Sequence, residues 1–115
     1  MANSVGSLNQ EQIELMVGSL LGDGYVRIVP DRKNAFLEIN HSYRQRDYVD
    51  WKYAVLKDIV RMPPHPRRTN GKRIAYRFFT QQHPEITTIW QRWYVNGQKK
   101  IPEDLVIPTM EYKLG

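Results

Sequence analysis

A predicted helix over residues 9–22 carries two glycines four positions apart, and this spacing constrains the fold more than any other feature of the chain. An apolar stripe recurs at helical spacing through Ile13, Met16, Val17 and Leu20. Leu15, Gly18 and Gly22 lie on a second face of the same helix. Glycine inside a helix costs about 1 kcal/mol relative to alanine, so Gly18 indicates a surface that another backbone approaches closely. Alternatively, Gly18 packs against the chain's own sheet and Gly22 only caps the helix.

A hairpin and a second helix are predicted next. Residues 25–29 and 35–42 alternate between apolar and polar side chains, and a Pro-Asp-Arg-Lys-Asn turn separates them, as is typical of an antiparallel hairpin. Residues 46–60 then predict a helix, which the proline-rich segment 62–66 ends. The expected buried stripe of this helix consists of Tyr48, Trp51, Val55, Leu56 and Ile59.

A second hairpin and a third helix complete the pattern. Residues 67–69 and 72–80 flank an Asn-Gly pair, which is a strong hairpin signal. The third helix is expected to start near Pro84 and to end at the Asn-Gly pair of positions 96 and 97. The order α-β-β-α-β-β-α predicts an α+β fold. We expect an N-terminal arm over residues 1–8, one domain over 9–105 and a C-terminal tail over 106–115.

Composition narrows the classes of function. The chain has 115 residues, 17 Lys and Arg against 12 Asp and Glu, and no cysteine. The lack of cysteine excludes a disulfide scaffold, a cysteine-ligated zinc site and a cysteine nucleophile. No apolar run approaches the roughly 20 residues that span a bilayer, so no membrane partner is expected. The net charge of +5 favours a polyanionic partner.

Basic residues gather on the two predicted hairpins. They are Arg27, Arg32, Lys33, Arg67, Arg68, Lys72, Arg73 and Arg77, and polar residues Glu38, Asn40 and Ser42 are interleaved with them. In a DNA major groove, arginine can read guanine, asparagine adenine and glutamate cytosine. A four-stranded sheet with this face is therefore a candidate DNA-binding surface, and an ordinary solvated sheet face is the alternative.

Two further features are candidates for chemistry. Asp23 lies where the first helix is expected to end, and a carboxylate with exposed backbone carbonyls suits a hard divalent cation. One carboxylate is too few for a tight site, so a paired copy of the helix would have to supply a second. A lysine within residues 97–102 would stabilise negative charge if it lay near a metal and a phosphodiester. A solvated turn and a solvated loop are the respective alternatives. His41, His65 and His83 show no metal-ligand spacing.

These features occur in the order found in a known family. Residues 15–25, with the sequence LMVGSLLGDGY, resemble the signature of the LAGLIDADG homing endonucleases, with Gly18 at its first glycine and Asp23 at its metal-binding acid. Later landmarks of that family are matched in order by residues 41–48, 79–80, 83–84 and 96–102. The likeness covers about residues 10–105. It implies an αββαββα fold with a four-stranded, saddle-shaped antiparallel sheet on DNA.

The resemblance also implies an activity. It is site-specific, metal-dependent cleavage of double-stranded DNA, the reaction of intron homing. Asp23 and the Gly22 carbonyl would bind Mg²⁺ or another divalent cation such as Mn²⁺, and no organic cofactor is expected. Asp23 and Lys99 would be the catalytic residues, with Lys100 in place of Lys99 if the register is off by one.

A single copy of the motif implies a homodimer on a roughly palindromic target, with the motif helices packed together. The implied dimer contacts are Leu15, Gly18, Ser19 and Gly22. Expected base-reading residues are Arg27, Glu38, Asn40, Arg73 and Arg77, and expected phosphate contacts are Lys33 and Arg68. Half of a two-motif enzyme, a catalytically silent RNA maturase or DNA-binding regulator of this fold, and a basic scaffold protein remain alternatives. The compartment is expected to be intracellular, with an organelle, a bacterium and a phage-infected cell all open.

Overall fold

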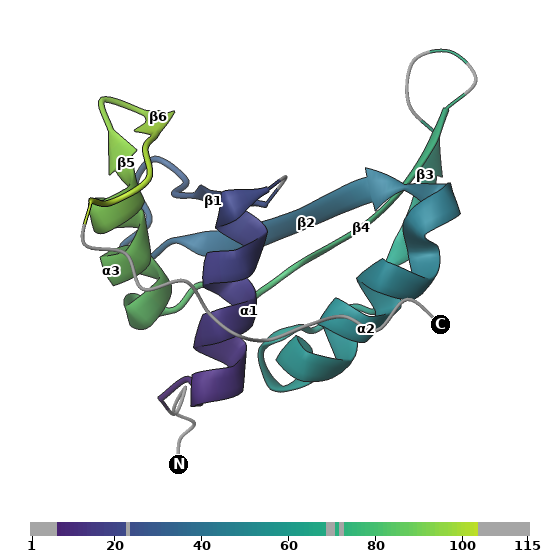
Figure 1. Cartoon of the computed structure of the whole chain (residues 1–115), viewed down its shortest axis with the longest axis horizontal. Helices are drawn as coiled ribbons and strands as arrows, with labels where there is room; N and C mark the ends of the chain where they lie inside the picture. Colours follow the sequence, from purple (N-terminus) through teal and green to yellow (C-terminus); the bar gives the residue numbers. More distant parts are fainter. Residues whose placement is uncertain (1–6, 23, 69–70, 72, 104–115) are drawn as a thin grey trace.

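Three helices cover one face of a four-stranded antiparallel sheet in the computed structural model, which describes residues 7–22, 24–68, 71 and 73–103 (Figure 1). The helices are α1 (Gln10–Leu21), α2 (Arg46–Leu56) and α3 (Pro84–Trp93), with 3₁₀ turns η1 (Tyr43–Gln45) and η2 (Lys57–Ile59) flanking α2. The strands are β1 (Tyr25–Arg27), β2 (Phe36–Ser42), β3 (His65–Arg68), β4 (Ile74–Phe79), β5 (Tyr94–Val95) and β6 (Gln98–Lys99). The predicted α+β class is confirmed.

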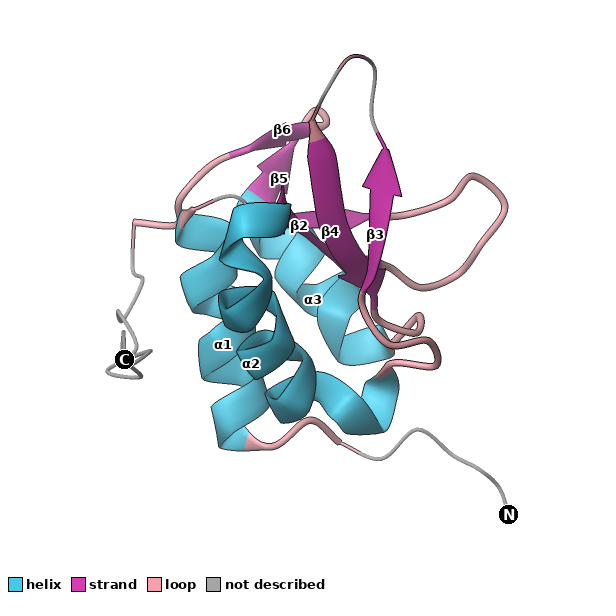
Figure 2. Ribbon diagram, turned by 90° about the vertical axis from the view of Figure 1, so that its right-hand side faces the viewer, coloured by secondary structure: helices cyan, strands magenta, loops and turns pink. Residues whose placement is uncertain are grey.

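The main sheet has the strand order β1-β2-β4-β3, and all its neighbours are antiparallel. Val26, Leu37, Ile39 and Phe78 point to the helices and are almost fully buried. Met16 and Leu20 of α1 and Ile86 of α3 belong to the same core. In Figure 2 the helices lie together on one side of the strands, which leaves the other sheet face uncovered by any helix. The alternation expected for the first hairpin therefore gives one buried and one outward face.

The first helix begins at a cap that the sequence specifies. The Asn9 side chain accepts a hydrogen bond from the backbone N–H of Gln12, and the Gln12 side chain accepts one from the backbone N–H of Asn9. This reciprocal capping box satisfies backbone donors that a helix start otherwise leaves unpaired. No helix in the described part of the chain is long and apolar enough to cross a membrane.

Two expectations about the later helices are wrong in detail. In α2 the buried residues are Val49, Lys52 and Leu56, whereas Tyr48 and Trp51 are only half-buried and stack on each other. Lys52 is only 3% exposed, and its ammonium lies 4.3 Å from the centre of the Tyr48 ring, one turn back on the same helix. Because one of the three buried positions of α2 is a lysine, the spacing of apolar residues alone does not identify the buried face of this helix.

The second difference concerns the Asn96-Gly97 pair. The third helix ends at Trp93, and Asn96 and Gly97 form the turn of a short hairpin in which Tyr94 pairs with Lys99. Both turn residues have positive φ, 52° and 79°, which is the conformation required by two-residue hairpin turns. The sequence signal was a hairpin turn, and the short strands around it lack the alternation that would have revealed them.

Gly24 makes the closest approach between the first helix and the first strand. Its N–H donates to the Ser19 carbonyl at 2.7 Å, and the Gly22 N–H donates to the same oxygen at 3.1 Å. A β-carbon at position 24 would lie 2.8 Å from the Ser19 β-carbon and 2.9 Å from its carbonyl carbon and oxygen. The position therefore has no room for a side chain.

We expect Gly24→Ala to lower the free energy of unfolding by about 1–3 kcal/mol, because backbone atoms must move to admit the methyl group. Gly18→Ala is the matched control, since a β-carbon at position 18 meets no atom within 4 Å. This control is expected to raise the stability of the isolated subunit by up to about 1 kcal/mol. Urea denaturation of dilute protein measures both changes. Equal effects of the two variants would contradict the packing described here.

Candidate active site and nucleic-acid surface

The end of the first helix and the last hairpin meet at Lys99. The Lys99 Nζ donates to the Gly22 carbonyl at 3.0 Å and to the Gly24 carbonyl at 2.9 Å. Lys99 is half-buried, whereas Lys100 is exposed and its backbone N–H donates to the Trp93 carbonyl. The structure therefore brings together Gly22 and Lys99, two of the residues singled out from the sequence. Asp23 lies outside the described residues.

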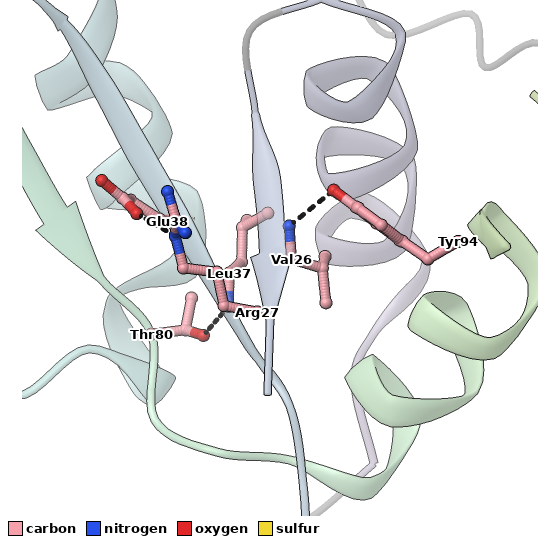
Figure 3. A network of polar contacts seen from close by, with 6 residues as sticks. All are labelled: Val26, Arg27, Leu37, Glu38, Thr80 and Tyr94. Atoms are coloured by element: carbon pink, nitrogen blue, oxygen red, sulfur yellow. Dashed lines mark hydrogen bonds and ion pairs between the residues drawn. The ribbon is translucent and has the colours of Figure 1, made fainter. Parts of the chain in front are cut away.

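Tyr94 ties the last hairpin to the first strand. Its hydroxyl accepts a hydrogen bond from the backbone N–H of Val26 at 3.0 Å, and burial raises the pKa of Tyr94 (Figure 3). Val26 is itself almost fully buried, so this N–H has no access to water. The contact fixes the start of β1 beside α3, and β6 follows within a few residues. Tyr94 thus helps to hold Lys99 over the end of α1.

The end of α1 has the donor chemistry that a hard cation needs. Two backbone carbonyl oxygens converge on one cationic group, the Lys99 ammonium. Carbonyl oxygens at the C-terminus of a helix carry partial negative charge and are ligands of the type that Mg²⁺ accepts. Among the described residues, no group of three or more His, Cys, Asp or Glu could hold a metal. A cation site here therefore needs ligands besides those that the described part of one subunit provides.

Tyr25 is a residue of this region that the sequence reasoning missed. The Lys99 Nζ lies 4.7 Å from the centre of its ring, and the Arg27 guanidinium carbon lies 5.6 Å from the same ring. Tyr25 is half-exposed on the outward face of β1. The sequence did contain a signal for this role: Tyr25 directly follows Asp23-Gly24, and Arg27, two positions later, lies on the same face of the strand.

The outward face of the sheet carries several of the predicted DNA-binding residues. Arg27 and Glu38 form an ion pair, with the Arg27 Nε donating to the Glu38 carboxylate at 2.6 Å (Figure 3). Asn40 lies directly opposite Arg77 in the β2–β4 register. The Arg77 guanidinium lies 5.1 Å from the Phe79 ring centre, and its buried Nε has no hydrogen-bond partner in the described part of the chain.

The remaining predicted basic residues are distributed around this face. Arg67 lies opposite Ala75 and shares the outward face, whereas Arg68 lies opposite Ile74 and is on the helix side of the sheet. Arg32 and Lys33 are exposed in the β1–β2 loop, and Arg73 directly precedes β4. The Lys72 prediction falls outside the described residues. The register thus separates Arg67 from Arg68, which the sequence had grouped together.

The four predicted dimer contacts on α1 differ in their exposure within the subunit. Gly18 and Gly22 are exposed, whereas Leu15 and Ser19 are only 4% and 3% exposed within the subunit. Leu15 belongs to the subunit's own core, and Ser19 is covered by the turn at Gly24. Leu15 and Ser19 therefore leave almost no surface in the subunit for a partner, and their place in a dimer contact stays a prediction. Leu21, 38% exposed, lies beside the two glycines instead.

Comparison with known proteins identifies the family. The model of the LAGLIDADG DNA endonuclease family matches residues 13–109. The chain belongs to this family. The RecA protein of Mycolicibacterium flavescens is 31% identical over 103 residues, which cover 87% of this chain and 23% of that protein. The RecA protein of Mycobacterium gastri is 39% identical over 71 residues, which cover 60% of this chain and 16% of that protein.

Two other relatives have names that refer to nucleic acids. The cytochrome b mRNA maturase bI2 of Debaryomyces hansenii is 26% identical over 105 residues, 85% of this chain and 40% of that protein. The homing endonuclease I-WcaI, solved bound to its DNA recognition sequence, superposes with a TM-score of 0.71 at 23% identity, over 83% of this chain and 43% of that one. The LAGLIDADG chain thus spans less than half the length of each of these four proteins.

We expect Tyr94→Phe to lower the free energy of unfolding by about 1–2 kcal/mol, because the buried Val26 N–H loses its acceptor. Tyr53→Phe is the control. Tyr53 also packs a half-buried ring in the core, against Phe78, and no hydrogen bond of its hydroxyl is present in the described part of the chain. Thermal denaturation compares the two variants. A loss of stability no greater in Tyr94→Phe than in Tyr53→Phe would show that the Val26 contact is unimportant.

Proposed function

We propose that this LAGLIDADG chain is a site-specific, metal-dependent endonuclease that cleaves double-stranded DNA as a homodimer on a roughly palindromic target. The observation that carries the proposal is the contact of Lys99 with the Gly22 and Gly24 carbonyls, the residues that flank Asp23. Lys99 thus contacts the carbonyls of the two residues that precede and follow the motif's acid in the sequence, which supports a role for its positive charge at that acid. Family membership supports the same activity.

Asp23 and the Gly22 carbonyl are the proposed ligands of Mg²⁺ or a related divalent cation. Both are hard oxygen donors at the C-terminal end of a helix, which fits such an ion. When bound, the metal supplies Lewis-acid stabilisation of the attacking and leaving oxygens and lowers the pKa of water. Lys99 contributes a positive charge beside the scissile phosphate, where negative charge increases during the reaction. Tyr94 and the β5–β6 turn keep that ammonium in place.

The outward sheet face is the proposed DNA-binding surface. Asn40 and Arg77 lie opposite each other on neighbouring strands, and both side chains have the hydrogen-bonding groups that read purines in the major groove. Lys33 and Arg32, which are exposed in the β1–β2 loop, are proposed to contact phosphates. The I-WcaI structure, which contains DNA, has the same fold and supports this assignment.

Gly18 and Gly22 support pairing of two subunits through α1. The β-carbon of any other residue at position 18 would meet no atom of the subunit within 4 Å, so packing within the subunit does not require glycine there. A second α1 lying against this strip explains the glycine and brings the two copies of Asp23 near each other. The second α1 comes from an identical subunit in this proposal. A further domain of a longer chain is the alternative that we expected from the sequence.

Asp23→Asn tests the nuclease assignment. We expect the variant to lose more than about 100-fold in cleavage rate, since the effect of a direct metal ligand exceeds that of an outer-shell partner. Affinity for the target should stay within a few-fold, because the sheet supplies the binding. The measurement is cleavage of sites selected from a randomised DNA library with Mg²⁺, alongside binding with Ca²⁺. A parent chain that binds but never cleaves would exclude the nuclease activity.

Gly18→Met tests the homodimer. Methionine is a good helix former, so the subunit should remain folded, but its side chain would separate two helices packed at this strip. We expect at least about a tenfold loss in the fraction that binds target DNA as a dimer, as measured by analytical ultracentrifugation, because overpacking a tight contact is unfavourable. Ala54→Met places the same side chain at an exposed position of α2 and should have no effect. Dimers of unchanged affinity in Gly18→Met would contradict pairing through α1.

A catalytically silent nucleic-acid-binding protein of the same fold is the second candidate. The maturase relative, aligned over 85% of this chain, is the observation that favours it. Such a protein would bind its nucleic acid without metal-dependent cleavage, and Asp23→Asn would leave its activity unchanged.

A further inference from the structure

A small pocket lies between the end of α1 and the outward face of the sheet. Its volume is about 270 Å³, and it is lined by Gly22, Tyr25, Arg27, Glu38 and Asn40. Gly22 belongs to the proposed metal site, and the other residues come from β1 and β2. Arg27 is thus placed at the active-site end of the DNA-binding face and borders the same space as Gly22.

Tyr25 places two positive charges beside this pocket. Its ring is contacted by the Lys99 ammonium at 4.7 Å and by the Arg27 guanidinium at 5.6 Å. Cations are attracted to the electron-rich face of an aromatic ring. The ring therefore acts as a common support for Lys99 of β6 and Arg27 of β1, two strands that are far apart in the sequence.

Glu38 fixes the other side of Arg27. Tyr25 and Glu38 lie directly opposite each other in the β1–β2 register, and Arg27 reaches diagonally to the Glu38 carboxylate through Nε. The Glu38 side chain is 10% exposed, whereas that of Arg27 is 56% exposed. Glu38 holds Nε at one edge of the guanidinium, and within the described residues no hydrogen bond engages either Nη group, so both can donate to a ligand. This is a preorganised donor of the kind that binds phosphate oxygens.

We propose that Arg27 contacts a backbone phosphate next to the scissile bond, as a second cationic group of the active site, and that Tyr25 and Glu38 are its positioning residues. The inference rests on the proposed nuclease function. It replaces the base-reading role that we expected for Arg27 from the sequence. Glu38 is likewise removed from base reading, because its carboxylate is already engaged by Arg27.

The charge pattern favours phosphate over a base edge. Arg77, further along the sheet, lies opposite Asn40 in the register, and its buried Nε has no hydrogen-bond partner in the described part of the chain. Arg27 instead shares the Tyr25 ring with Lys99, whose ammonium contacts the Gly22 carbonyl that the proposed metal binding would engage. Two cations on one ring create a local positive potential, which a phosphodiester matches better than a neutral base.

The direct test is a binding cycle that needs no cleavage. A target duplex selected for binding with Ca²⁺ is prepared with a single uncharged methylphosphonate at each phosphate of its central turn in succession. At one or two positions beside the cleavage site, the methylphosphonate should weaken the binding of the wild-type protein about fivefold. The same methylphosphonate should weaken the binding of the Arg27→Gln variant less than about twofold, because the variant has already lost the contact with that phosphate and the two changes are not additive. Lys57→Gln, which removes one charge from the exposed η2 turn, should behave as the wild type does.

The positioning residues are tested in the same assay. Tyr25→Phe retains the aromatic face and should keep the full coupling between Arg27 and the phosphate. Tyr25→Leu removes that face, and Glu38→Ala removes the acceptor of Nε, so both should reduce the fivefold effect toward no effect. A merely structural role would instead make Tyr25→Phe and Tyr25→Leu alike once thermal stability has been compared.

The outcomes separate this inference from the proposed function. Independent, multiplicative effects of Arg27→Gln and the methylphosphonate at every central position would overturn the inference, whether or not the protein cleaves DNA. Arg27→Gln that relaxes base preference at one position would also overturn it and restore the base-reading role. Absence of Mg²⁺-dependent cleavage in the wild type, with the coupling present, would overturn the nuclease assignment and leave the phosphate contact supported.

Discussion

The contact of Gly24 with the Ser19 backbone is the constraint on which the candidate site depends. One carbonyl oxygen accepts two N–H groups, and this closes the first helix and starts the first strand within three residues. Because the turn is this tight, the Gly22 and Gly24 carbonyls point to a common place, where the Lys99 ammonium meets both. A side chain at position 24 would open the turn and separate the two acceptors. The Gly22 carbonyl, the Lys99 ammonium that it accepts and the first strand of the sheet are all positioned from this point.

The site is assembled from segments far apart in the chain, and this explains why the hairpin of β5 and β6 matters despite its size. The Tyr94 hydroxyl accepts a hydrogen bond from the Val26 N–H and so connects β5 to β1. The turn at Asn96-Gly97 then returns the chain toward α1. The aromatic ring of Tyr25 completes the arrangement by contacting both Lys99 and Arg27. Electrostatic preorganisation of this kind needs rigid supports, because the charges must already be in place when substrate binds.

Much of the fold could be predicted from the sequence, because local signals agree with it. The Asn9 cap, the alternating strands and Pro84 at the first turn of α3 locate the elements within a few residues. The motif also indicated Gly22 together with Lys99. Tertiary packing was not predictable in the same way: the burial of Leu15, Ser19 and Lys52 and the position of the Tyr25 ring between two cations each depend on which segments meet. Periodicity identifies a face of a helix, but it does not show which neighbour covers that face.

The open space beside Gly18 has a consequence for engineering. A helix-interior glycine with room for a methyl group is the kind of position that thermostability selection replaces, since alanine gains helix propensity and loses little else in the lone subunit. A screen that scored only melting temperature would therefore favour alanine at the position where we propose that two subunits pair. Variants of this protein should be selected both for their free energy of unfolding and for their affinity for the DNA target.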